Sequence, residues 1–121
     1  MKTQWITNKG KKILLLDFSN CGHDIESVKP EMAHALQLIK NELPNSVLTL
    51  TDVRGTRGSP EMFTLMRETS SKITPFAKKR AVVGITGAQQ TFLNIINQFS
   101  SGKKIVQFDD INEARDWLVN E

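Results

Sequence analysis

The stretch KILLLDF, Lys12–Phe18, is apolar almost throughout. This is the pattern of a β-strand that is covered on both of its faces, as the strands of parallel sheets are. A second stretch of the same kind, AVVGIT at Ala81–Thr86, lies further along the chain. Segments with helical periodicity separate these strands, and the alternation predicts an α/β fold.

Three more strands complete the predicted sheet. Gln4–Thr7 precedes a strand at Lys12–Ser19, and the sequence NKG at residues 8–10 predicts a hairpin turn because Asn and Gly tolerate positive φ. Val47–Val53 and Ile105–Phe108 follow. The last four strands each lead into a helix, so right-handed crossovers make them parallel. We therefore predict four parallel strands plus an antiparallel N-terminal edge strand.

Four main helices are predicted from apolar residues that share one face. The first begins at Asp24 or Ser27 and stops at Pro44, and the second begins at Ser59, an N-cap followed by Pro60 at the first helical position. The inward side chains are predicted to be Val28, Met32, Ala35, Leu36, Ile39 and Leu43 in the first helix, and Met62, Phe63 and Met66 in the second.

The two remaining helices lie in the C-terminal third of the chain. The third is predicted to end at Ser101 and Gly102, and the fourth to begin with Asp110 as its N-cap. The inward side chains are predicted to be Phe92, Ile95, Ile96 and Phe99 in the third helix, and Ile111, Ala114, Trp117 and Leu118 in the fourth.

Length and composition describe one ordinary globular domain that spans residues 1–121. The formal charge of +3 is mildly basic, and aromatic residues are only 7% of the chain, with no tyrosine. Nucleic-acid-binding domains usually carry denser basic patches, often with stacking aromatics. We therefore expect no specific nucleic-acid partner.

Signals for export, membrane insertion and zinc binding are absent from the sequence. The first residues, MKTQWITNKGKK, lack the apolar block of a signal peptide, and the longest aliphatic run, Ile13–Leu16, cannot span a bilayer. A single cysteine, Cys21, excludes an intrachain disulfide and zinc motifs with paired cysteines. We expect a cytoplasmic protein without a metal or a cofactor.

Two stretches carry a resemblance to a known family. RAVVGIT at Arg80–Thr86 and VQFDDINEARDWL at Val106–Leu118 are similar to the closing strands and helix of STAS domains, in particular of the stand-alone SpoIIAA-like (STAS/SEC14-like) subgroup. The resemblance covers nearly the whole chain. It implies a STAS/SpoIIAA-like fold and a bacterial, non-enzymatic regulatory module that binds a partner protein.

The family also suggests a modification site. In its anti-anti-sigma factors, the loop after the second parallel strand carries a phosphorylatable serine at the start of the next helix. The equivalent stretch here is DVRGTRGSPEM, residues 52–62, which makes Ser59 the candidate phosphosite. The aspartate-serine-serine-glycine sequence of those factors is absent, and the loop is shorter.

Ligands of parallel sheets bind beyond the carboxyl ends of the strands. At this edge we place the candidate residues for a ligand or partner: Arg54, Thr56, Arg57, Gly58, Ser59, Thr86 and Gly87. Arg54, Arg57 and the N–H groups at the start of the Ser59 helix would attract an anion. Alternatively, the glycines only form the turn, Ser59 caps the helix, and the arginines are solvated.

Basic residues are predicted to gather at the opposite edge, where the parallel strands begin. They are Lys11, Lys12, Lys78, Lys79, Arg80, Lys103 and Lys104. Charges that flank apolar strands limit aggregation. The alternative is a basic footprint for an acidic partner or a membrane surface.

The sequence leaves three functional hypotheses. The first is a non-enzymatic module that presents the rim of loops to a partner protein or a small anionic ligand. The second is a carrier that holds an apolar or lipid-like molecule between the sheet and a helix. The third is an enzyme with Cys21 as nucleophile and His23 as base. The edge strand Gln4–Thr7 also leaves open a weak homodimer.

Overall fold

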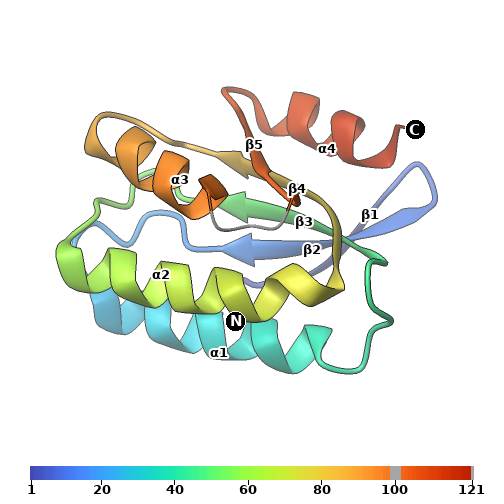
Figure 1. Ribbon diagram of the computed structural model, residues 1–121, viewed down its shortest axis with the longest axis horizontal. Coiled ribbons are helices and arrows are strands. Elements are labelled where there is room, and N and C mark those ends of the chain that lie inside the picture. The colour runs from blue at the N-terminus through green and yellow to red at the C-terminus, as the bar shows by residue number, and fades with distance from the viewer. Residues whose placement is uncertain (99–101, 121) are drawn as a thin grey trace.

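The computed structural model describes residues 1–98 and 102–120. Five strands and four helices follow one another in the order β1 (Gln4–Asn8), β2 (Lys11–Asp17), α1 (Ile25–Ile39), β3 (Val47–Asp52), α2 (Pro60–Ile73), β4 (Ala77–Val83), α3 (Ala88–Gln98), β5 (Ile105–Phe108) and α4 (Ile111–Val119), as Figure 1 shows. A short 3₁₀ turn, Thr74–Phe76, joins α2 to β4.

The strands form one sheet in the sequential order β1-β2-β3-β4-β5. β1 pairs antiparallel with β2, and the other neighbours are parallel. The predicted fold class is therefore confirmed: four parallel strands, an antiparallel N-terminal edge strand and four main helices. Among the described residues, no helix is long and apolar enough to cross a membrane.

The helices divide unequally between the two faces of the sheet. Parallel strands laid down in one direction with right-handed crossovers must place every crossover helix on the same face. α1, α2 and α3 accordingly pack on one face, whereas α4, which follows β5, covers the other (Figure 1). The sheet has a hydrophobic core on each face, and alternate residues of a strand point into one core or the other. In β2, Leu14 and Leu16 face the three helices and Ile13 faces α4.

The hairpin between β1 and β2 is confirmed, and its turn is one residue shorter than predicted. Lys9 has φ 50° and Gly10 has φ 79°, which are the two positive φ values of a type I′ turn. Asn8 belongs to β1 and pairs with Lys11.

Two side chains that we predicted to face inward are exposed. Leu43 is 74% exposed and lies beyond α1, which ends at Ile39. Its position before Pro44 disfavours helical backbone. In α3, Ile95 is 40% exposed, and Leu93 occupies the buried position instead. Phe99 and Ser101 lie outside the described residues.

The fourth strand also differs from its prediction. β4 runs from Ala77 to Val83 instead of Ala81 to Thr86, because its pairing with β3 already begins at Ala77 and Gly84 leaves the strand with φ 96°. Lys78, Lys79 and Arg80 therefore lie inside the strand and not before it. Lys79 points toward α4, where its Nζ donates to the carbonyl of Trp117, and Arg80 points toward α2 on the opposite face.

Candidate functional site

The rim of loops at the carboxyl edge is held together by backbone hydrogen bonds. Asn20 donates to the Arg54 carbonyl at 2.7 Å, and Gly22 and the 54–59 loop exchange bonds: Gly22 donates to Gly55 at 3.0 Å and Arg57 donates to Gly22 at 2.7 Å. The side chain of Thr56 is buried beneath this ladder. Its hydroxyl accepts from the N–H of Cys21 at 3.0 Å and donates to the carbonyl of Phe18.

Of the two arginines predicted to attract an anion, Arg54 is already paired. Its Nε and Nη2 donate to the two carboxylate oxygens of Asp52 at 3.0 and 2.8 Å. This pairing is the main reason why the pKa of Arg54 is raised. Arg57 is exposed, and no ion pair between described residues involves it. The rim therefore offers one available guanidinium and not two.

Ser59 is the N-cap of α2, as predicted. Its Oγ accepts from the backbone N–H of Met62 at 3.1 Å, and Pro60 follows at the first helical position. The hydroxyl thus satisfies one of the N–H groups that a helix start leaves unpaired. A phosphate on Ser59 remains a prediction.

Thr86 shares a shallow hollow with the arginine loop. The hollow is lined by Arg54, Gly55, Thr56, Arg57, Gly84 and Thr86. Gly84 lets the loop approach, since a Cβ there would lie 2.5 Å from the backbone N of Arg54. Gly87 is exposed but does not line this hollow. The structure thus brings together part of the predicted rim site.

The Cys21 thiol and His23 are not joined by any contact of the described residues. The thiol donates to the carbonyl of Ser19 at 3.4 Å, and His23 is exposed. In the described part of the chain, no group of three His, Cys, Asp or Glu side chains is arranged to hold a metal ion.

The basic edge exists, but most of its lysines have structural partners. Lys79 donates to the carbonyls of Trp117 and Asn120, and Lys11 donates to that of Val119 at 3.1 Å. These ammonium groups satisfy the carbonyls at the C-terminal end of α4, where cations are favoured. Lys12 pairs with a carboxylate, that of Glu42, at 2.9 Å. The assignment of Arg80 to this edge is wrong, because Arg80 is buried on the face that the three helices cover.

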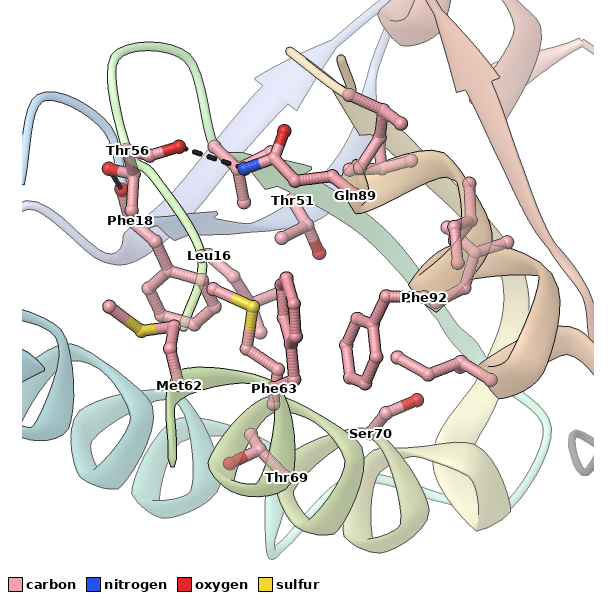
Figure 2. Close-up of a pocket in the computed structure, with 18 of the residues that line it drawn as sticks. Leu16, Phe18, Thr51, Thr56, Met62, Phe63, Thr69, Ser70, Gln89 and Phe92 are labelled. Atoms are coloured by element: carbon pink, nitrogen blue, oxygen red, sulfur yellow. Dashed lines mark hydrogen bonds between the residues drawn. The ribbon is translucent and has the colours of Figure 1, made fainter. Parts of the chain in front are cut away.

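A second candidate site is an apolar pocket between the sheet, α2 and α3. The cavity measures about 80 Å³. Its walls come from four strands and two helices and are mostly apolar side chains, among them Leu16, Val53, Met62, Met66, Val82, Leu93 and Ile105. Figure 2 shows Leu16, Met62, Phe63 and Phe92 around this space.

Two contacts connect α3 to α2 and to the loop that precedes α2. The rings of Phe63 and Phe92 stack with their centroids 4.3 Å apart, as Figure 2 shows. Gln89 donates from Nε2 to the carbonyl of Thr56 at 2.8 Å. Gly58 provides the space for the Phe63 ring, since a Cβ at Gly58 would lie 2.1 Å from it. Thr56 and Gly58, which we placed in the rim site, thus also line the pocket.

The comparisons with known proteins concern the fold. No family model matches the chain, and no curated protein matches it either. A solved structure does match, that of an uncharacterized protein of the DUF3478 family from Shewanella loihica, described as having a SpoIIAA-like fold. The match has 23% sequence identity and a TM-score of 0.66, and it covers 96% of this chain and 91% of the other. The fold is SpoIIAA-like.

The SpoIIAA-like fold confirms the family resemblance at the level of structure. The sequence analysis raised such a pocket only through the carrier hypothesis, without naming its lining, and it missed the buried Arg80. A signal was present in the sequence: Arg80 lies two residues before Val82, and positions two apart in a strand share a face. A strand start at Ala77 would have placed Arg80 on a covered face.

Proposed function

We propose that this chain is a non-enzymatic binding module that holds a small, largely apolar molecule in the pocket between α2, α3 and the sheet. One observation carries the proposal: an apolar cavity lies under two helices whose Phe63 and Phe92 rings stack on one another. Small-molecule sites are mostly apolar concavities with a few polar groups. An apolar cavity of ~150 Å³ is large enough to hold benzene, whereas this cavity measures about 80 Å³. A bound molecule would therefore have to separate the rings of Phe63 and Phe92.

The proposed pocket is connected to the rim. Thr56 and Gly58 border the cavity and belong to the loop that carries Arg57 and Ser59. Because the Phe63 ring lies against Gly58, a ligand that displaces this ring also moves the loop. Occupancy of the pocket would thereby change the surface that a partner meets, which is how a binding module becomes regulatory.

Titration with octanol, a neutral apolar molecule, tests the proposal. We expect NMR shifts of the methyl groups of Met62 and Met66, which line the cavity. Thr51→Met fills the floor of the pocket and should weaken binding about tenfold or more. Thr86→Met, in the rim hollow, is the matched control and should bind as the unsubstituted chain does. No shifts at millimolar octanol, or equal binding by Thr51→Met, would contradict the proposal.

A partner protein that binds the rim is the second candidate function. It is favoured by the exposed Arg57 beside the hollow that Arg54 and Thr86 line. We expect millimolar phosphate to shift the backbone amides of residues 54–59, and Arg57→Gln to abolish those shifts. Shifts that persist in Arg57→Gln would assign the anion to the helix start alone, and no shifts would remove the anion site.

A further inference from the structure

Arg80 is a cation enclosed in the core. It is 4% exposed and lies in β4, paired with Thr49 of β3 and Ile105 of β5. Its position in the strand turns its side chain toward the face that α2 covers. There Nη2 donates to Ser70 Oγ at 2.8 Å, and Nη1 donates to Thr74 Oγ1 at 3.0 Å.

The charge of Arg80 has no counter-ion in the described part of the chain. Both of its partners are neutral hydroxyls, and its Nε is buried without a hydrogen-bond partner. A guanidinium has five N–H groups, so three remain available. Burial lowers the pKa of Arg80 to about 10, which leaves it charged at neutral pH. Arg54 differs from Arg80, because the Asp52 carboxylate accepts two hydrogen bonds from its guanidinium.

An unpaired charge in an apolar interior is unfavourable unless an anion compensates it. Arg80 lines the same cavity whose walls are otherwise mostly apolar. A second cation, Lys103, lies close by. Its Nζ donates to the carbonyl of Thr74 at 2.9 Å, and the hydroxyl of the same threonine accepts from Arg80. The local field therefore favours a negative group at this end of the pocket.

The shape of the pocket separates a charged end from an apolar end. Arg80 is in register with Thr49, and the lining continues along β3 through Thr51 to Val53. The five residues from Thr49 to Val53 span about 13 Å. Phe63, whose ring stacks on Phe92, lies seven residues before Ser70 in α2, about 10 Å along the helix axis.

We propose that Arg80 is the anion-binding residue of the pocket and that the ligand is an amphiphilic monoanion, a carboxylate with an elongated apolar body. The carboxylate accepts from the free N–H groups of Arg80, which suit bidentate recognition. The apolar body lies along β3 toward the Phe63 ring. A single enclosed guanidinium matches one negative charge. This inference rests on the proposed function and names the class of its ligand.

Octanoate and octanol have the same chain length, so a comparison of their affinities tests the anion-binding role of Arg80 separately from the apolar pocket. We expect the unsubstituted chain to bind octanoate at least about tenfold more tightly than octanol, since a hydrogen bond to a charged group is worth that factor or more. The Nε–H resonance of Arg80 should shift with octanoate and not with octanol. Equal affinities, or an unmoved Nε–H resonance, would overturn the role of Arg80 and leave the apolar pocket standing. No binding of either molecule would overturn the pocket itself.

Substitution of Arg80 gives the second arm of the test. Arg80→Met should bind octanoate about tenfold more weakly and octanol at least as well as before. Arg67→Met removes an exposed cation from the same helix that covers the pocket, and it should change neither affinity. Unchanged octanoate affinity in Arg80→Met would overturn the proposal. If Arg80→Met does not fold, the role of Arg80 is tested on the unsubstituted chain alone, by the ratio of its octanoate and octanol affinities and by the Nε–H resonance of Arg80.

Discussion

Replacing Arg80 with methionine is expected to stabilise the unliganded protein. Methionine keeps an unbranched side chain but removes the charge. Burial lowers the pKa of Arg80 to about 10, well below its ordinary value. At about 1.4 kcal/mol per pH unit, the fold disfavours the charged side chain by about 3 kcal/mol.

Two hydrogen bonds offset part of this gain. Arg80→Met loses the bonds to Ser70 and Thr74, each worth about 1 kcal/mol. Thr74 keeps a partner, since its hydroxyl also donates to the Ser70 carbonyl at 2.8 Å. The expected net increase in the free energy of unfolding is about 1 kcal/mol, in line with replacements of other buried charges by apolar residues.

Urea unfolding followed by circular dichroism at pH 7 measures this change. Arg67→Met is the control for removal of a cation at the surface of α2, and its free energy of unfolding should change by less than about 0.5 kcal/mol. A loss of more than about 1 kcal/mol in Arg80→Met would mean that the hydroxyl partners outweigh the burial of the charge. Arg80 would then be a structural clamp between β4 and α2.

Two further predictions concern the helix start and the response to acid. Ser59→Ala should lower the free energy of unfolding by roughly 0.5–2 kcal/mol because the N–H of Met62 loses its acceptor. Ser59→Asp should retain the cap. An equal loss of stability in the thermal melts of both variants would contradict the capping role of Ser59. Burial opposes ionisation of Glu31, but the N–H groups of Thr3 and Lys2, at 2.9 and 3.1 Å, hold its pKa below the ordinary value. The Glu31 carboxylate therefore stabilises the fold when the pH is above that ordinary pKa. It loses this stabilising effect as the pH falls through the lower pKa that it has in the folded protein. Glu31→Gln should be less stable than the unsubstituted chain at pH 7, and the difference should shrink below about pH 4; a constant difference from pH 7 to 3 would refute the linkage.

Some features of this protein follow from residues close together in the sequence. The apolar strands and helical periodicities predict the order of elements along the chain, and right-handed crossovers make the last four strands parallel. The cap of α2 is equally local, since Ser59 and Met62 are three residues apart. Errors arose where local signals were ambiguous: Ile95 is apolar but lies off the buried face of α3.

The site depends on contacts that no local pattern specifies. Arg80 belongs to a run of three basic residues, and only the register of β4 against β3 and the position of α2 enclose it. The pairing of Arg54 with Asp52 is instead local, since the two residues are two positions apart, and the sequence analysis did not weigh it. The sequence determines which segments become strands and helices because those preferences act over a few residues. Which charges become paired, exposed or buried is decided by the packing of elements, because burial is a property of neighbours that arrive from elsewhere in the chain.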